Sequence, residues 1–564
     1  MFIISIWNLL FIFLFFFAFL FFLTGLTLLM KSYGIYISWI LFSWSSSNII
    51  FTLLLDWVSM MFLSFVMFIS GSVFYYSGEY MTGEVDTSRF IMLLTGFVTS
   101  MALLILSPNL ISILLGWDGL GLVSYCLVVY YQNVKSLNAG TLTVLSNRVG
   151  DVFILMGIVF MINYGDWNFI AWLGDSTSLI LVSSLMILAS LTKSAQIPFS
   201  AWLPAAMAAP TPVSSLVHSS TLVTAGVYLV IRLGWVYDFW LNELLSVVSV
   251  LTMFMAGLGA CFEFDLKKII ALSTLSQLGL MMYSLSLGLI SVTLFHLLMH
   301  ALFKALLFMS AGCIIHAYSN WQDLRSMGSV MMSLPYISSC FVVANLALVG
   351  MPFLSGFYSK DLLLEVSLMQ EVNFLSLIML FIATGLTVVY TFRLIYYITY
   401  REDVLDGAFN INDGKGKMIS SCLGLTMFSL LFGSLMSWLL MEVPNIILPY
   451  SLKLLTLAVC IFGGMLGGSM VISSNMMAYE KNLLLWLQGN MWFLPYLSSQ
   501  PFLVSPLKSG GYMKDSGDSG WLEYSGGQGM WSELITISLY LQKLNNKELK
   551  VFLSVSLLFY LIFM

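Results

Sequence analysis

The chain contains 564 residues, of which 60% are hydrophobic and 9% are charged, and its mean hydropathy is +0.96. Because water-soluble domains carry about 25% charged residues, this composition excludes a soluble globular protein. The net charge of −5 is small and is distributed over short loops, which argues against a nucleic-acid-binding surface.

Long apolar runs divide the chain into candidate membrane spans, each needing about 20 apolar residues. The first run, Phe2 to Met30, is too long for the apolar stretch of a cleaved signal peptide and predicts a retained helix. Residues 33–48, with Trp39 and Trp44, are expected to lie at the membrane surface. The further expected spans lie near residues 50–76, 89–106, 109–131, 143–163, 178–196, 212–233, 243–262, 266–287, 290–315, 331–350, 373–399, 417–441, 450–473 and 548–564. Together they predict an all-α polytopic membrane protein with about 15 transmembrane helices.

The span near 109–131 contains Asp118 in the sequence GWDGLG, about 14 Å from the start of the span. This depth is close to the bilayer centre, where an ionised carboxylate costs several kcal/mol unless it is paired or hydrated. Lys193 in the span near 178–196 is the expected partner, and its proton affinity would change if the carboxylate moved. The two residues predict a proton switch, with a fixed structural ion pair as the alternative.

Four other charged residues are expected to have structural or solvated positions. Arg148 and Asp151 in NRVGD are spaced i to i+3, so they can form an ion pair along one helix. Lys267 and Lys268 fall between two expected spans and are expected to be solvated.

Two spans are interrupted in a similar way. TKSAQIPFSAWLP begins at Thr192 and LVGMPFLSGFYSKD begins at Leu348, and each joins a lysine, Lys193 or Lys360, to a break that contains proline. Non-helical backbone at membrane depth must line a wet cavity, and paired broken helices are typical of transporters built from two inverted repeats. Two ordinary proline kinks are the alternative, but kinks alone do not account for the lysines.

The span near 290–315 carries three ionisable residues within FHLLMHALFKALLFMSAG. His296, His300 and Lys304 recur every four residues, so they share one helix face over about 12 Å. A lone membrane histidine is usually a packing residue, whereas three titratable groups in line predict a proton relay. His218 and Lys360 extend the series. Two histidines beside a lysine make a poor metal site, and no GxGxxG or P-loop sequence indicates nucleotide binding.

The C-terminal part of the chain differs from the rest. Gly463, Gly464, Gly467 and Gly468 form overlapping GxxxG patterns, which predict close helix packing. Beyond residue 474, polar residues become frequent, and the mixed stretch from Trp531 to Lys550 predicts a lateral amphipathic helix before a final anchor helix. The expected organisation is N-terminal helices and an interfacial segment (1–108), the inverted-repeat core (109–400), further helices (401–475), a loop and lateral helix (476–547) and the anchor (548–564).

These motifs, together with APTPVSSLVHSSTLVTAG from Ala209 and STLSQLGLMM from Ser273, resemble the antiporter-like membrane subunits of respiratory complex I. The resemblance covers about residues 50 to 400. It implies a proton-translocating membrane-arm subunit of NADH:ubiquinone oxidoreductase in the mitochondrial inner membrane. The implied partners are the other membrane-arm subunits, membrane lipids and protons, without nucleic acid.

The resemblance also implies that electrons pass from NADH to ubiquinone in other subunits, which would hold NADH, FMN, iron–sulfur clusters and ubiquinone. This chain would then belong to an enzyme, a proton-translocating NADH:ubiquinone reductase, without a cofactor, metal or redox centre of its own.

Carried over motif by motif, the resemblance implies a proton path on this chain. Asp118 stands where the family commonly has the longer Glu, Lys193 and Lys360 match the lysines of the two broken helices, and His218 matches a connecting histidine. The implied path residues are Asp118, Lys193, His218, His296, His300, Lys304 and Lys360.

Two other functions remain compatible with the sequence. A stand-alone sodium/proton antiporter shares the broken helices and buried lysines, and it predicts sodium-dependent transport. A structural scaffold with frozen ion pairs predicts that neutralising Lys304 leaves proton pumping unchanged.

Overall fold

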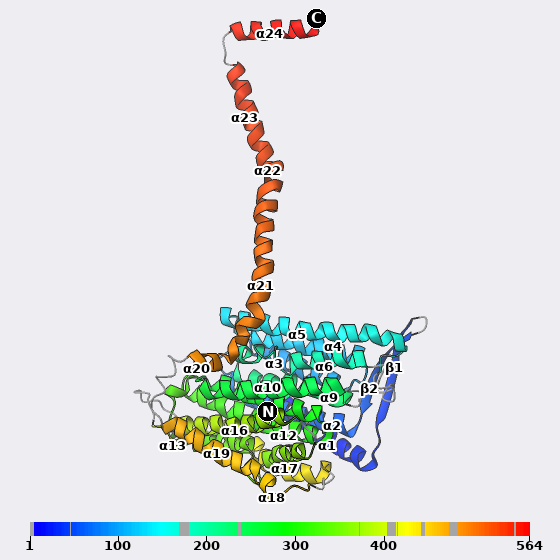
Figure 1. Ribbon diagram of the computed structural model, residues 1–564, viewed down its shortest axis with the longest axis vertical. Coiled ribbons are helices and arrows are strands. Elements are labelled where there is room, and N and C mark those ends of the chain that lie inside the picture. Colours follow the sequence, from blue (N-terminus) through cyan, green and yellow to red (C-terminus); the bar gives the residue numbers. More distant parts are fainter. Residues whose placement is uncertain are drawn as a thin grey trace. The chain divides into compact units, whose positions relative to one another are not determined.

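The computed structural model describes residues 5–44, 47–168, 180–234, 239–370, 373–402, 413, 416–441, 446–472, 483–545 and 549–564. The described chain is mostly helical and divides into two compact units, Met1–Pro495 and Tyr496–Met564 (Figure 1). The expected span ends at residues 2–4, 178–179, 473 and 548, and the expected loop at 476–482, lie outside the described residues.

The helices of the first unit are α1 (Ile6–Lys31), α2 (Trp57–Tyr80), α3 (Thr87–Leu106), α4 (Leu110–Val128), α5 (Val134–Met161), α6 (Ile180–Lys193), α7 (Trp202–Ala205), α8 (Thr211–Val213), α9 (Leu222–Leu233), α10 (Phe239–Phe262), α11 (Leu266–Ser286), α12 (Ile290–Ala317), α13 (Val330–Ser333), α14 (Pro335–Val349), α15 (Leu362–Met369), α16 (Phe374–Ile395), α17 (Lys417–Leu440), α18 (Tyr450–Lys453), α19 (Leu455–Ile472) and α20 (Leu483–Gly489). Three π-helical turns, η4 (Ser214–Thr221), η6 (Phe357–Asp361) and η7 (Tyr396–Tyr400), continue or precede these helices.

Eleven helices of the described chain are long and apolar enough to cross a membrane, and α6, α14, α19 and α24 (Leu549–Phe563) are shorter apolar helices. The expected polytopic helical fold is therefore confirmed, although the count of 15 depends on these four shorter helices. Most boundaries agree with hydropathy to within a few residues. The largest shift is at α5, which begins at Val134 rather than near residue 143.

One expected span is wrong in its first part. Residues 50–55 belong to an antiparallel hairpin of β1 (Ile35–Trp44) and β2 (Ser47–Leu55), and α2 begins only at Trp57. The run NIIFTLLL is apolar enough for a helix, but its β-branched and aromatic residues also suit a strand. The Asp56 backbone N–H donates to the Ser59 Oγ at 2.9 Å, which marks the helix start after the strand.

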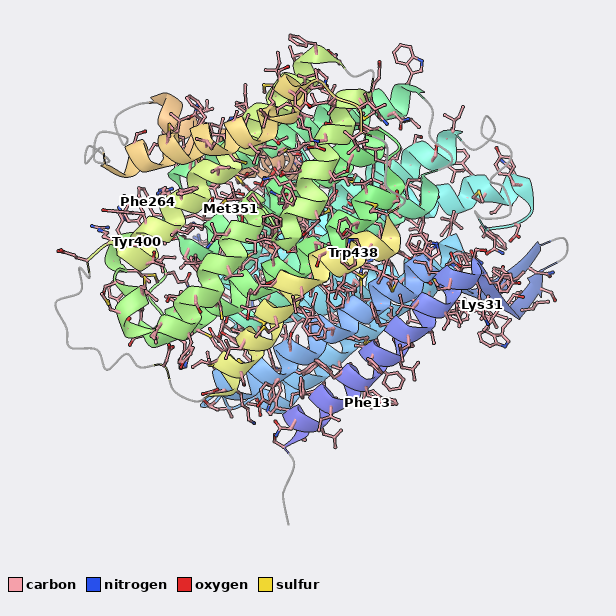
Figure 2. All side chains as sticks on the ribbon, turned by 90° about the horizontal axis from the view of Figure 1, so that it is seen from below. Phe13, Lys31, Phe264, Met351, Tyr400 and Trp438 are labelled. Carbon is pink, nitrogen blue, oxygen red and sulfur yellow. The ribbon has the colours of Figure 1, made fainter. Side chains whose placement is uncertain are left out.

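The centre of the bundle is formed by α11 and α12. The apolar windows of both helices are completely buried, whereas those of α1 and α17 are 17% and 28% buried. α12 packs against α2, α11, α14, α17 and η4. Figure 2 shows Phe13 and Lys31 of α1 and Trp438 of α17 on the outside of the bundle. His296, His300 and Lys304 therefore lie on one of the two candidate spans of the described chain whose apolar windows are completely buried.

The glycine pattern of α19 is confirmed as a packing face for two of its four positions. A Cβ on Gly463 would lie 2.8 Å from the Gly385 carbonyl oxygen of α16, and one on Gly467 would lie 3.0 Å from the Val389 carbonyl oxygen. A side chain at Gly463 would clash with backbone, and one at Gly467 would be tightly confined, so small residues favour this close approach. Gly468 has no neighbouring atom within 4 Å of its Cβ position, so it does not contribute to the contact.

The second unit continues α21 (Leu494–Met513) through a π-helical segment (Lys514–Trp521), α22 (Leu522–Ser525), α23 (Gly527–Asn545) and α24. Helix is already present well before Trp531, where the lateral helix was expected to begin. Its orientation along the membrane stays a prediction.

Candidate functional site

Lys193 is the last residue of α6 and is completely buried. Its Nζ donates to the Trp117 carbonyl oxygen at 2.8 Å and lies 3.8 Å from the centroid of the Trp117 ring. The helix stops here, and the Trp202 indole N–H donates to the Thr192 carbonyl oxygen at 3.1 Å, which satisfies one carbonyl freed at the helix end. The first break expected from the sequence is therefore present, with its lysine held by a carbonyl and an aromatic face.

Asp118 forms no direct ion pair with Lys193, although the two charges interact electrostatically. The expected contact is therefore wrong, whereas a role of Asp118 in modulating Lys193 stays a prediction. Among the ion pairs of the described residues, the Asp118 Oδ2 lies 3.5 Å from the Arg148 Nη1. The physical reason is helical geometry, because Asp118 follows Trp117 and projects about 100° further round α4. Trp117 faces α6 while Asp118 faces α5. The short aspartate side chain does not bridge this difference.

The expected ion pair of Arg148 and Asp151 is present at 3.1 Å. The same Nη1 atom of Arg148 contacts Asp118, so two carboxylates share one guanidinium nitrogen. Asp151 is buried, whereas the side chains of Arg148 and Asp118 are 45% and 35% exposed. A cation shared between two acids can shift toward either one, which is a property that a simple pair lacks.

His218 lies in the π-helical turn η4, between α8 and α9. Its ring lies 6.2 Å from that of Trp202, centroid to centroid, and neither ring nitrogen has a hydrogen-bond partner in the described part of the chain. Buried serine hydroxyls flank it in the same turn, including Ser215 and Ser219. Buried polar atoms are normally satisfied, so this histidine is suited to bind water.

His296 and His300 lie one turn apart on α12, with ring centroids 6.3 Å apart. The His296 Nδ1 is 2.9 Å from the Ser359 Oγ, and its Nε2 is 3.3 Å from the Gln277 Oε1. Both nitrogens of His300 lack a partner among the described residues, and its ring packs edge-on against Phe303. The two rings therefore lie on one face, as the spacing predicted.

Lys304 continues this face, and its Nζ donates to the Ser273 Oγ at 2.5 Å. Ser273 and Gln277 are one turn apart on α11, so α11 supplies a hydroxyl and an amide opposite Lys304 and His296. The sequence analysis missed both partners. The i, i+4 spacing of polar residues within STLSQLG was the available signal.

Lys360 lies in the π-helical turn η6, beyond the end of α14 at Val349. The helix ends on Gly350, whose φ of +94° suits glycine. The Lys360 Nζ donates to the carbonyl oxygens of Leu348 and Val349, at 3.3 and 3.2 Å, and to the Thr387 Oγ1 at 3.0 Å. The second expected break is thus also present, and again a lysine contacts backbone carbonyls.

Lys267 is not solvated, contrary to the sequence interpretation. It is 6% exposed, and its Nζ donates to the Ala209 carbonyl oxygen at 3.3 Å. The segment around Ala209 covers the start of α11, which the linear sequence does not reveal. Lys268 is half-exposed and pairs with Asp265 at 2.8 Å.

Three family models match the chain. NADH-Ubiquinone oxidoreductase (complex I), chain 5 N-terminus, matches residues 39–91, the transmembrane family NADH:quinone oxidoreductase/Mrp antiporter matches residues 107–387, and NADH dehydrogenase subunit 5 C-terminus matches residues 390–564. Most of the chain lies within these matches, including every residue of the implied proton path from Asp118 to Lys360.

Solved structures confirm the fold at low sequence identity. A chain in the structure of the Mrp complex from Dietzia sp. DQ12-45-1b superposes with a TM-score of 0.74 and 21% identity, over 96% of this chain and 63% of that chain. A chain of the membrane-bound sulfane sulfur reductase, an archaeal respiratory membrane complex, superposes with a TM-score of 0.67 and 21% identity, over 82% of this chain and 94% of that one.

Curated relatives are much closer in sequence. The NADH-ubiquinone oxidoreductase chain 5 of Anopheles quadrimaculatus is 52% identical over 96% of this chain and 95% of its own length. That of Locusta migratoria is also 52% identical, over 96% of both chains. With this identity along almost its whole length, the chain belongs to the NADH-ubiquinone oxidoreductase chain 5 family.

Proposed function

We propose that this chain carries protons across the mitochondrial inner membrane as a membrane-arm subunit of NADH:ubiquinone oxidoreductase, along the path from Asp118 to Lys360. Membership of the family makes the chain part of an oxidoreductase complex and gives it the other subunits of that complex as partners. NADH, FMN, iron–sulfur clusters and ubiquinone belong to those other subunits. This chain's own contribution is the transfer of protons.

The observation that carries this proposal is the titratable face of α12. His296, His300 and Lys304 follow one another along a helix whose apolar window is completely buried, and all three are themselves buried. Each ionisable group at this depth is costly, so a scaffold gains nothing from three in a row. Imidazoles and hydroxyls both accept and donate hydrogen bonds, which is the property that proton transfer along a chain of groups needs.

Lys360 of the second broken helix lies next to one end of this face, and the proposed path continues from the other end to Lys193 of the first broken helix. His296 contacts Ser359, the neighbour of Lys360, so the α12 face leads directly to the second break. Toward the first break, His218 and its serine-rich turn pack against α12. Water bound by the unpartnered nitrogens of His218 and His300 completes the path between the two lysines.

Lys304→Met tests the proposal, because methionine keeps the length of the side chain and removes the proton. In the purified complex reconstituted into vesicles, we expect NADH oxidation coupled to proton uptake to fall by at least about tenfold, since side chains that transfer protons contribute factors of about 10² or more. Lys268→Met is the matched control, because that lysine is half-exposed and paired with Asp265.

Normal NADH oxidation and proton uptake in an assembled Lys304→Met complex would contradict the proton path and favour the scaffold. The free sodium/proton antiporter is not favoured, because the identity to chain 5 relatives extends over almost the whole chain. Sodium-dependent transport by this chain in the absence of the other subunits would instead favour the antiporter function.

A further inference from the structure

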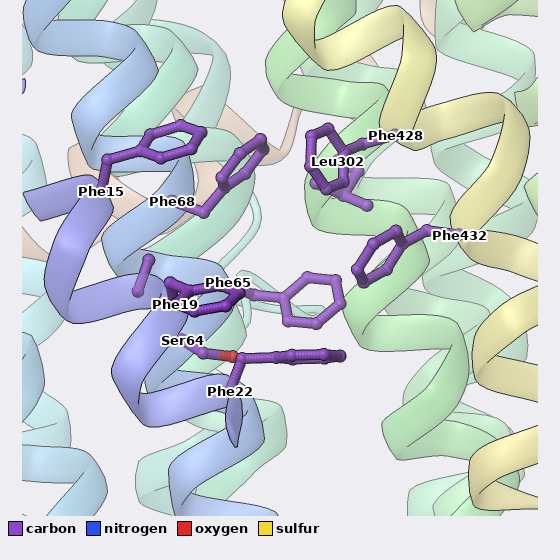
Figure 3. Close-up of a pocket in the computed structure, with 10 residues that line it drawn as sticks. Phe15, Phe19, Phe22, Ser64, Phe65, Phe68, Leu302, Phe428 and Phe432 are labelled. Carbon is purple, nitrogen blue, oxygen red and sulfur yellow. The ribbon is translucent and has the colours of Figure 1, made fainter. Parts of the chain in front are cut away.

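A pocket of about 250 Å³ lies between α1 and α17 (Figure 3). Phenylalanine rings from both helices form its sides, and Leu302 of α12 and residues of α2 complete the wall. Its one polar side chain is Ser64, whose hydroxyl already donates to the Met61 carbonyl oxygen at 2.6 Å. The pocket therefore offers no unused polar group and suits an apolar occupant.

The pocket is closed at one end and open toward the other. The Phe22 and Phe432 rings meet with centroids 5.8 Å apart and close the end nearer the C-termini of α1 and α17. Phe19, which lines the pocket, is 62% exposed. One turn before Phe428, a Cβ on Gly424 would meet no atom within 4 Å. An elongated occupant can therefore leave the pocket along α17 toward the start of that helix.

A cation lies at that start. The Lys417 Nζ donates to the Asn8 Oδ1 at 3.1 Å, so the first turns of α1 and α17 lie side by side. None of the ion pairs formed by the described residues includes Lys417. The nearby Glu79 carboxylate instead accepts the Met418 backbone N–H at 2.9 Å. The ammonium group thus retains the capacity to bind an external anion.

We propose that the pocket binds one acyl chain of an anionic membrane phospholipid, with its phosphate on Lys417. From Asn8 to Phe22, α1 rises about 21 Å. This length equals half of the roughly 40–45 Å thickness of a bilayer with its headgroups, so one lipid leaflet spans the distance from Lys417 to the closed end. Charge at one end, apolar lining at the other and this separation together match a phospholipid.

The proposed lipid site also contacts α12, on the face opposite the titratable residues of the proposed proton path. Leu302 lies between His300 and Lys304 but is about 200° away from each around α12. The acyl chain would therefore pack against the back of the helix that carries the titratable face. The lipid site does not depend on the roles of the path residues.

Photolabelling of the intact complex tests this inference. The complex is reconstituted into phosphatidylcholine vesicles with a small fraction of either phosphatidylglycerol or phosphatidylcholine that carries a diazirine near the end of one acyl chain. After irradiation, mass spectrometry maps the labelled peptides. We expect label on the α1 and α17 peptides that line the pocket, severalfold more from the anionic probe.

Three variants separate the headgroup from the chain. Lys417→Gln should reduce labelling by the anionic probe to the level of the zwitterionic probe, whereas Lys31→Gln, at the other end of α1, should leave it unchanged. Gly424→Leu should block the way into the pocket and suppress both labels. Native gels establish that each complex assembles, and the comparison of the two probes on unmodified protein needs no variant.

Three results would overturn the inference. Pocket peptides that remain unlabelled while exposed lipid-facing peptides react would show that no acyl chain enters. Pocket residues carrying a photoreactive amino acid would crosslink to another subunit if a protein helix fills the site. Equal labelling by both probes, unaffected by Lys417→Gln, would exclude the phosphate contact.

Discussion

Arg148 is shared between two acids, and this sharing changes what a mutation at Asp118 is expected to do. Because Asp151 contacts the same nitrogen, removal of one carboxylate leaves the arginine with a partner. Arg148, and not Lys193, makes the direct ion pair with Asp118. Lys193 is instead held by the Trp117 carbonyl oxygen on the neighbouring residue of α4.

We predict that Asp118→Asn lowers proton pumping only in part, whereas Asp118→Asn combined with Asp151→Asn lowers it by more than the sum of the single effects. Residues that share one partner are not expected to be additive. The measurement is the ratio of protons pumped to NADH oxidised in coupled vesicles. Asp118→Glu, which keeps the charge, serves as the control. Unchanged pumping in both the single and the double variant would rule out a role for this cluster.

At the scale of elements, α16 contacts both the turn that carries Lys360 and the helix α19. It carries Thr387, which accepts a hydrogen bond from Lys360, and its other side approaches α19 at Gly385. The contact between α16 and α19 leaves no space for a side chain at Gly463. Packing at this contact therefore contributes to the position of Thr387, the hydrogen-bond partner of Lys360.

We predict that Gly463→Leu destabilises the chain by about 1–3 kcal/mol, the usual cost of overpacking a close contact. The added side chain meets the Gly385 carbonyl oxygen, which belongs to helical backbone and cannot rotate away. Gly468→Leu is the matched control, since its Cβ position is open. Thermal denaturation of the purified complex provides the measurement, and equal midpoints for both variants would contradict this account of the packing.

Hydropathy was sufficient to locate the spans, because a bilayer selects apolar length almost regardless of sequence. It failed at residues 50–55, where a strand and a helix are equally apolar.

The spacing of His296, His300 and Lys304 located a shared face, since helical periodicity is local information. The partners Ser273, Gln277 and Thr387, and the coverage of Lys267, depend on which helices become neighbours. The π-helical turns that carry His218 and Lys360 have no sequence pattern of comparable strength.

At the scale of the whole molecule, the second unit carries an apolar stripe. Met530, Leu534, Ile537 and Leu541 recur at helical spacing on α23, and each is more than half exposed. An exposed stripe of this kind indicates a surface that is covered in the assembled complex. Membership of the chain 5 family supplies the other subunits as partners for such a surface.

We predict that Ile537→Glu reduces incorporation of the chain into the complex, because a charge in the middle of the stripe opposes burial. Gln542→Glu introduces the same charge about 140° away around α23 and should be tolerated. Blue-native gels that compare the complex with free chain provide the measurement. Full incorporation of Ile537→Glu would show that the stripe is not an assembly surface.

The three contacts of Lys360 have a mechanical consequence. An ammonium group has three hydrogens, and here it donates to three acceptors that lie on α14 and α16. The neutral amine has two hydrogens, so after losing a proton this nitrogen can donate to only two of the three acceptors. On the proposed path, each deprotonation of Lys360 would therefore weaken the hydrogen bonds that join its turn to α14 and α16.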